Sequence, residues 1–144
     1  MVMLSKKSKY AIIALIHLAK RYGDGPILIG NIAEKENIPK KFLEGILFEL
    51  KNAGIVNSQR GKSGGYYLIK KPQEVHLAQI MRLFDGSIAL IPCVTYQYYE
   101  PCPECTDEKS CAIRKIFKQV RDATVEILKK STLEEMIKIE AIDI

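Results

Sequence analysis

The sequence predicts a mainly α protein, namely a winged helix-turn-helix with a two-stranded wing and a long C-terminal dimerisation helix. Three patterns among its 144 residues lead to this fold class. Two helical patterns, at about 29–36 and 39–53, are joined by a very short turn. A glycine-rich segment with a strand-like run on each side follows them. Farther along, 111–130 is a long amphipathic pattern with apolar residues at i, i+3, i+4 and i+7.

The N-terminal half is expected to contain three helices. Ser5 can cap the first, over about 5–22. Asn37 stands just after the second, where a helix end favours a residue with left-handed backbone. The third, over about 39–53, has one apolar and one basic face, which is typical of a helix-turn-helix. Two helices that merely pack together give the same pattern, so the following segment has to decide between the two interpretations.

Residues 55–69 predict a β-hairpin of the wing type. Two short strands flank a turn from Gly61 to Gly65, with Lys62 at its tip. Glycines let such a tip approach a phosphate backbone, and Lys62 can donate to it. A nucleotide-binding phosphate loop is the alternative, but such a loop precedes a helix and has a different lysine register. The wing is therefore the favoured interpretation.

The C-terminal half is expected to place a loop between two helices. The first of these helices covers about 77–84, and the long one covers 111–130. The apolar stripe of the long helix exceeds what a head with its own core can bury, so we expect a homodimer. The loop is the only long irregular segment, and such loops are usually functional or disordered. Thr132 begins a short last helix with a capping box.

Charge and compartment narrow the classes of function. Residues 1–71 contain 13 Lys and Arg but 5 Asp and Glu, whereas 72–144 contain 9 and 12. A cationic head predicts a polyanion partner, although lysine-rich surfaces also occur in heat-adapted proteins. No apolar run approaches the ~20 residues that span a bilayer, and no secretory signal is recognised, so we expect a cytoplasmic protein. No catalytic constellation stands out, so we do not expect an enzyme.

All four cysteines, Cys93, Cys102, Cys105 and Cys111, lie in or at the end of the loop. In a reducing compartment, clustered cysteines indicate metal or redox chemistry more often than disulfides. Thiolates suit iron–sulphur clusters, zinc and copper(I), and Cys102 with Cys105 forms a Cys-x-x-Cys pair. The residues alone leave open an iron–sulphur cluster, a zinc site, a metal-free thiol sensor and inert cysteines.

Several motifs in order along the chain match one family. They are Leu4–Ala11, Ile32-Ala33-Glu34, Phe42-Leu43-Glu44, Gly54-Ile55-Val56 and the wing segment Arg60–Tyr66. Together they resemble the Rrf2 family of bacterial winged-helix regulators, which includes IscR, NsrR and CymR. The resemblance covers nearly the whole chain, and the wing segment carries most of its weight.

The resemblance implies a cytoplasmic homodimer that binds double-stranded operator DNA. The third helix would read the major groove and the wing would enter the minor groove, while Glu44 and Arg60 match DNA-contacting positions of IscR-like proteins. The expected DNA-binding residues are Lys6, Lys40, Lys41, Glu44, Arg60, Lys62, Ser63, Gly64, Gly65 and Tyr66. The resemblance also implies that cysteines before the long helix hold an iron–sulphur cluster in the sensing members.

The cysteine pattern departs from the family in two ways. Where IscR has a histidine ligand after the last cysteine, this chain has Arg114, and Cys102 is an additional cysteine. Where NsrR uses an acidic residue near its N-terminus, this chain has Lys7-Ser8-Lys9. A site made of four thiolates is the simplest resolution. Such a site suits a two-iron or a four-iron cluster, with zinc as the alternative metal.

The sequence thus predicts a DNA-binding transcriptional regulator that senses iron–sulphur or redox status through a cysteine-ligated cluster. A metal-free thiol-redox or cysteine-metabolism repressor is the first alternative, and a small metal or redox carrier protein is the second. We expect a DNA-binding region at 1–72, a connecting helix and linker at 73–91 and a sensor loop at 92–111. The dimerisation helix and a short last helix would occupy 112–144.

Overall fold

The computed structural model describes residues 4–142. Its head, residues 4–85, contains α1 (Lys6–Lys20), α2 (Ile29–Glu36), α3 (Lys40–Asn52), strands β1 (Val56–Gln59) and β2 (Gly65–Leu68), the 3-10 turn η1 (Pro72–Glu74) and α4 (Leu77–Asp85). An arm, residues 86–130, consists of the 3-10 turn η2 (Pro92–Val94), the cysteine loop (residues 92–111) and α5 (Ala112–Lys130). The last helix, α6 (Leu133–Ile142), returns to pack on α1. Six helices and one two-stranded sheet confirm the predicted fold class.

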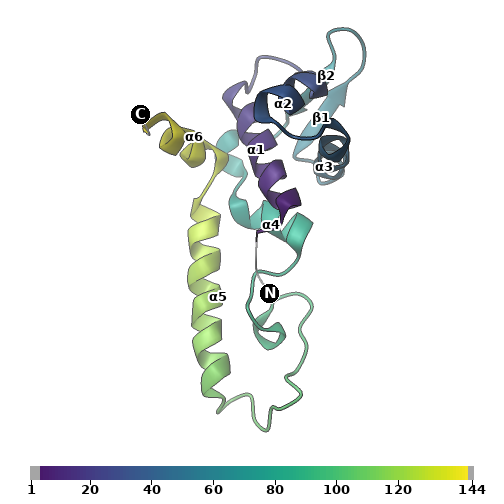
Figure 1. The fold of residues 1–144 in the computed structure, drawn as a ribbon. Helices are drawn as coiled ribbons and strands as arrows, with labels where there is room; N and C mark the ends of the chain where they lie inside the picture. Colours follow the sequence, from purple (N-terminus) through teal and green to yellow (C-terminus); the bar gives the residue numbers. More distant parts are fainter. Residues whose placement is uncertain (1–3, 143–144) are drawn as a thin grey trace.

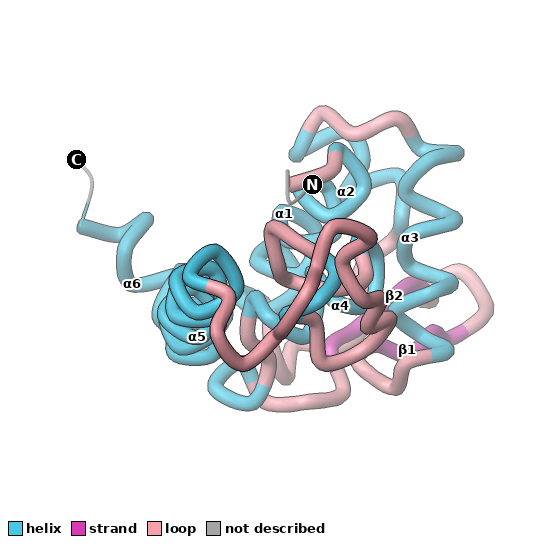
Figure 2. Tube along the Cα trace, turned by 90° about the horizontal axis from the view of Figure 1, so that it is seen from below, coloured by secondary structure: helices cyan, strands magenta, loops and turns pink. Residues whose placement is uncertain are grey.

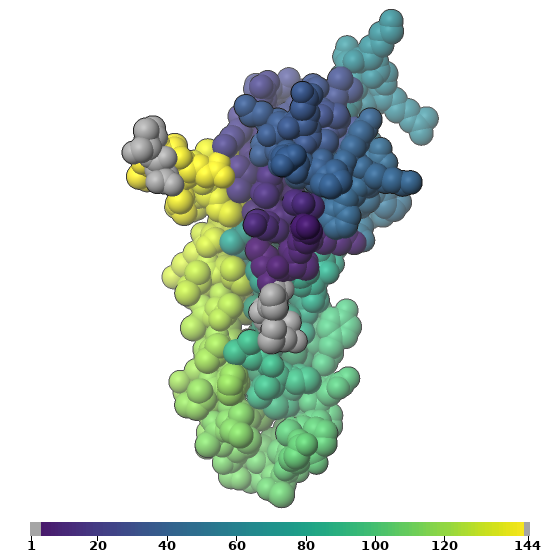
Figure 3. Space-filling view, viewed as in Figure 1, coloured from purple at the N-terminus to yellow at the C-terminus, as the bar shows by residue number. Residues whose placement is uncertain are grey.

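The head and the arm project in different directions (Figures 1 and 3). The wing lies at one end of the molecule, and the cysteine loop lies at the opposite end, beside the start of α5. When α5 is viewed nearly end-on, the loop runs from it across the molecule in front of α4 (Figure 2). The expected DNA-binding and sensing regions are therefore well separated, with α4 between them.

Local signals in the sequence explain where the head helices begin and end. The Ser5 hydroxyl accepts a hydrogen bond from the Ser8 amide at 3.0 Å and so caps α1. That helix ends at Lys20 rather than near Tyr22, because the amides of Arg21 and Tyr22 bond three residues back in a tightened turn. Asn37 has φ 55° and ψ 47°, the left-handed conformation that its position predicted.

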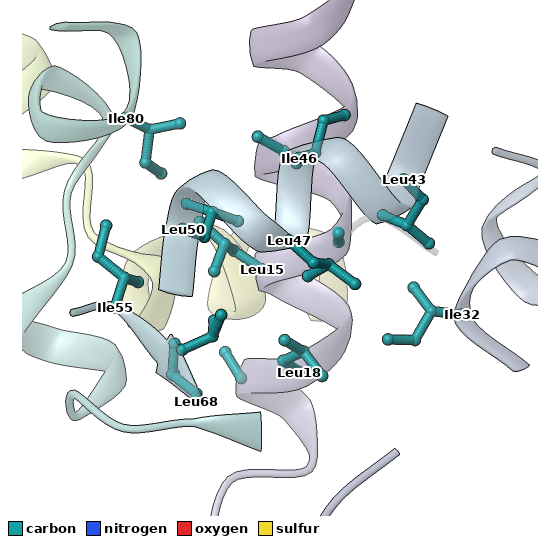
Figure 4. Close-up of a cluster of buried hydrophobic side chains, with 14 of the residues drawn as sticks. Leu15, Leu18, Ile32, Leu43, Ile46, Leu47, Leu50, Ile55, Leu68 and Ile80 are labelled. Atoms are coloured by element: carbon teal, nitrogen blue, oxygen red, sulfur yellow. The ribbon is translucent and has the colours of Figure 1, made fainter. Parts of the chain in front are cut away.

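The core of the head lies between α1 and α3 and is closed by α2, the wing and α4 (Figure 4). Its apolar side chains recur at helical spacing and are almost completely buried. They include Leu15, Leu18, Ile32, Leu43, Ile46, Leu47, Leu50, Ile55, Leu68 and Ile80, all at most 4% exposed. Complete burial of so many branched side chains gives the head a dense core, to which Leu133 of α6 also belongs at 0% exposure.

The wing is held by backbone pairing on both sides of β2. Strand β1 pairs with β2 from Val56 opposite Leu68 to Gln59 opposite Gly65. On the other side, Tyr66 and Ile27 exchange two backbone hydrogen bonds of 2.8 Å each. A Cβ atom on Gly65 would lie 2.1 Å from the backbone oxygen of Ile27, and the φ angle of Gly65 is +142°. Internal packing therefore requires glycine here, whatever the wing contacts outside the chain.

The arm has a much smaller core. A second buried cluster joins α4 to α5 through Ala78, Met81, Ile88 and Val125. The inner face of α5 contains Arg121 and Val125, whereas much of its predicted apolar stripe faces outward. Ile113, Ile116, Val120 and Ile127 are 39–66% exposed. Within residues 4–142, no helix is long and apolar enough to span a membrane.

Candidate DNA-binding surface and cysteine loop

The outer face of α3 carries the polar residues that the sequence singles out for DNA. Lys40, Lys41 and Glu44 are exposed, while the opposite face of the helix is buried in the head core. The same outer face shows Phe48, at 60% exposure. A helix with one buried face and one polar, cationic face can enter a groove without disturbing the core that supports it.

The wing divides its expected DNA-binding residues into two groups. Arg60, Lys62 and Ser63 are exposed at and beside the tip. Gly64 is buried, and a Cβ atom there would lie 2.1 Å from the backbone oxygen of Gln59. The two glycines and half-buried Tyr66 thus shape the hairpin, and the three exposed side chains are free to contact phosphate.

Lysines at the start of α1 also differ in their surroundings. Lys6 is exposed. Lys7 forms an ion pair of 2.9 Å with Glu49 of α3 and lies over the ring of Phe84. This packing of Lys7 between α1, α3 and α4 is not visible from its position in a lysine-rich segment.

The four cysteines lie in different environments. Cys93 is buried in η2, whereas Cys102 is exposed. Cys102 and Cys105 are joined by a turn in which the Cys105 amide donates to the Cys102 carbonyl at 3.0 Å. Cys111 caps α5, its sulphur accepting from the Arg114 amide at 3.4 Å. The donor set is therefore soft and gathered in one loop, as a cluster or zinc requires.

The arrangement of these thiols is not that of a finished metal site. Within residues 4–142, no three Cys, His, Asp or Glu side chains are placed to hold one metal ion. The Cys102 thiol instead donates to the Glu104 carboxylate at 3.1 Å, and this hydrogen bond raises the pKa of the thiol. The donor chemistry fits an iron–sulphur cluster, but the loop has to close before three or more thiolates can share it.

Arg121 anchors the loop to α5. Its side chain is 7% exposed, and its guanidinium donates to the carbonyl of Val94 at 2.5 Å and to Asp122 at 2.7 Å. The ring of Tyr96 lies 4.1 Å from the guanidinium carbon. Arg121 was not among the residues predicted from the sequence. Its role could have been suspected from the sequence, because Arg121 lies on the same face of the long helix as the apolar residues Phe117, Val125 and Leu128.

A carboxylate links the arm side of α4 to the start of α1. Asp85, the last residue of α4, accepts from the Ser5 amide at 3.2 Å, from the Ser8 hydroxyl at 2.8 Å and from the Ser5 hydroxyl. Burial alone would raise the pKa of Asp85, but the bonds from Ser5 and Ser8 together lower it below the usual value. Movement of α4 is thereby connected to the first helix of the head.

A helix-turn-helix with an exposed polar face, a cationic wing and a separate cysteine-bearing arm is the arrangement of a winged-helix transcriptional regulator. The family described as Rrf2, iron-dependent transcriptional regulator, matches residues 4–139. The chain belongs to the Rrf2 family, as the sequence motifs predicted. Its relatives are transcriptional regulators rather than enzymes.

Individual relatives support the same assignment. The chain is 42% identical over 138 residues to an rrf2-like HTH-type regulator of Rhodobacter capsulatus, which covers 94% of this chain and 92% of that protein. The structure of CymR, the global cysteine regulator of B. subtilis, matches with a TM-score of 0.80 at 32% identity and covers 96% of this chain and 98% of CymR. The T. potens IscR structure matches with a TM-score of 0.75 at 26% identity, covering 96% and 88%.

Proposed function

We propose that this transcriptional regulator works as a cytoplasmic homodimer whose cysteine loop controls its affinity for operator DNA. The observation that carries the proposal is the division of the chain. The exposed cations of α3 and the wing lie at one end, and all four cysteines lie in the arm at the other. The proposal keeps the division expected from the sequence, with 1–72 for DNA, 73–91 as connector, 92–111 as sensor and 112–144 for dimerisation.

The α3 face and the wing tip are proposed to contact DNA in different ways. Lys62 at the wing tip would donate to phosphate, whereas Glu44 and Arg60 would take part in sequence recognition. Lys62→Ala should weaken all DNA sequences alike and reduce the salt slope of binding by about one, because one phosphate contact is lost. Arg60→Ala should also relax sequence preference.

Binding to operator and random DNA over a range of salt concentrations measures both effects. The matched control is Lys115→Ala, which removes one exposed positive charge from α5. If Lys41→Ala, Arg60→Ala and Lys62→Ala combined leave operator affinity at the level of this control, the DNA surface has been assigned to the wrong face.

The sensor is proposed to be an iron–sulphur cluster held by Cys93, Cys102, Cys105 and Cys111. A bound cluster would supply a group whose loss reports iron shortage or oxidants. The chain's own residues transmit the state of the loop. Arg121 ties Val94, next to Cys93, to α5, and the Asp85 carboxylate ties α4 to the start of α1. A loop that opens can thereby shift α4 and, through it, the head.

A metal-free regulator of cysteine metabolism is the second candidate. It is favoured by the similarity to CymR, whose structure is described as that of a global cysteine regulator. The separate placement of the thiols among residues 4–142 is compatible with it as well. In this version, oxidation of the thiols or a cysteine-related signal would change the loop without a metal.

Anaerobic purification followed by iron, sulphide and zinc analysis separates these candidates. A cluster predicts coloured protein with matching iron and sulphide, loss of the cluster in Cys102→Ser and its retention in Arg114→Ala. Colourless protein with one zinc per chain would replace the cluster by a zinc site. Metal-free protein whose DNA binding responds to oxidant would establish the thiol sensor. Metal-free protein that ignores oxidant would remove the sensing role of the cysteines.

A further inference from the structure

A cavity separate from the four cysteines and from the proposed DNA surface lies where α4, the turn after it, the cysteine loop and α5 meet. Its volume is about 450 Å³, and it is lined by Arg82, Ser87, Ile88, Tyr96, Gln97, Val125 and Lys129. That size is in the range of small-molecule sites. The lining comes from three separate segments of the chain, so an occupant would touch all of them at once.

The charged groups at this cavity are of one sign. Arg82 and Lys129 both line it, and neither forms an ion pair with a carboxylate among residues 4–142. His76, which caps α4, is close enough for both to act on it. Burial, followed by the charges of Arg82 and Lys129, lowers the pKa of His76, which disfavours a third positive charge at this place. The chain thus concentrates uncompensated positive charge here.

The remaining walls supply polar and apolar surface in fixed positions. Ile88 and Val125 are buried members of the cluster that joins α4 to α5. The ring of Tyr96 is held against Arg121, and its hydroxyl donates to Asp122 at 3.3 Å. Asp122 is itself engaged by Arg121, so it is not available to neutralise the two cations across the cavity.

We infer that this cavity binds a small organic anion, with its carboxylate between Arg82 and Lys129 and its apolar part against Ile88 and Val125. Ser87 and Gln97 would supply further hydrogen bonds. Such a ligand would join α4, the loop and α5, which are the elements that connect the cysteines to the head. The chain would then have a second input that does not depend on what the cysteines bind.

The probe pair benzoate and benzamide tests this inference on the full-length protein in solution. The two have nearly the same shape, but only benzoate carries a negative charge. Titration followed by amide NMR should show saturable shifts at residues around the cavity, including Gln97 and Lys129. Benzoate should bind at least about tenfold more tightly than benzamide, because charge-assisted hydrogen bonds contribute roughly 1.5–3 kcal/mol.

Two variants and one matched control locate the binding. Arg82→Gln and Lys129→Gln should each weaken benzoate by about tenfold or more while leaving benzamide unchanged. Lys130→Gln is the control, because Lys130 is the next residue but pairs with Glu126 at 3.2 Å and does not line the cavity. The amide spectrum of each variant shows whether it is folded.

Three results would overturn the inference, and the first two need no variant. The first is equal affinity of the protein for benzoate and benzamide. The second is a set of amide NMR shifts with benzoate that spread over the cationic head and do not saturate. The third is binding by the Arg82 and Lys129 variants that matches the Lys130 control. The first result includes binding of neither probe, which is expected if a second copy of the chain fills the cavity.

Discussion

The head and the arm contrast in how each is stabilised. Every core side chain of the head is covered by other parts of the same chain, whereas α5 leaves Ile113, Ile116, Val120 and Ile127 exposed. The arm is held by one small apolar cluster and by the polar contacts of Arg121. The core of the head, completed by Leu133 of α6, is therefore covered within one chain, whereas the arm has an exposed apolar surface that a second copy can cover.

The largest expected effect is the loss of stability when a buried side chain is shortened, and its size compares the packing of the two cores. Leu47→Ala in the head should lower the free energy of unfolding by about 2–5 kcal/mol, because Leu47 is 0% exposed and its removal leaves a cavity. Val125→Ala in the arm should lower the free energy of unfolding by less than Leu47→Ala does, because its apolar cluster is small and fewer atoms are removed. Urea unfolding measures both. Phe48→Ala, at an exposed position on α3, is the control and should stay within about 0.5 kcal/mol.

The outer face of α5 provides the next test. Val120→Glu and Ile127→Glu should each weaken self-association by about 100-fold or more, because an unpaired charge would be buried at the dimer seam. Sedimentation velocity over a concentration series measures this change. Lys115→Glu, on the polar side of α5, should leave association nearly unchanged. A parent protein that sediments as a monomer would contradict the dimer.

A smaller change in stability is expected when either of two glycines of the head is replaced by alanine, and the two changes should have opposite signs. Gly65→Ala should destabilise the wing by about 1–3 kcal/mol, because its new methyl group would meet the Ile27 carbonyl at positive φ. Gly45→Ala, within α3 and with open space around it, should instead stabilise the protein by about 0.5–1 kcal/mol. Thermal unfolding of the two variants side by side gives opposite shifts. Equal shifts would mean that the wing is not held by Ile27.

The smallest effect concerns the joint between the two regions. Asp85→Asn should cost about 1 kcal/mol or less at neutral pH, since the carboxylate is exposed and accepts bonds at the start of α1. The lowered pKa of Asp85 means that its contribution is present above about pH 4, the unfolded value, and is lost as pH falls through the folded value. Stability curves of parent and variant should therefore converge on acidification. A constant difference down to pH 3 would show that ionised Asp85 does not hold the joint.

Local sequence signals determined most of the head. Ser5 and Asn37 mark helix ends through their own side-chain and backbone preferences, and the apolar spacing of α3 fixes which face is buried. These signals act over a few residues, so they can be recognised without the fold. The position of all four cysteines in or at the end of the loop before α5 was equally visible in the sequence, and it led to the hypothesis that the arm is a sensor.

Tertiary structure decided what depends on residues far apart in the chain. Asp85 meets Ser5 across 80 positions, and the carbonyl of Ile27 sets the need for glycine at 65. The orientation of α5 was also decided this way: helical spacing shows that it is amphipathic, but only packing against α4 and η2 turned Arg121 and Val125 inward. Spacing reports which residues share a face, while the contacts that bury one face arise from surfaces elsewhere in the molecule.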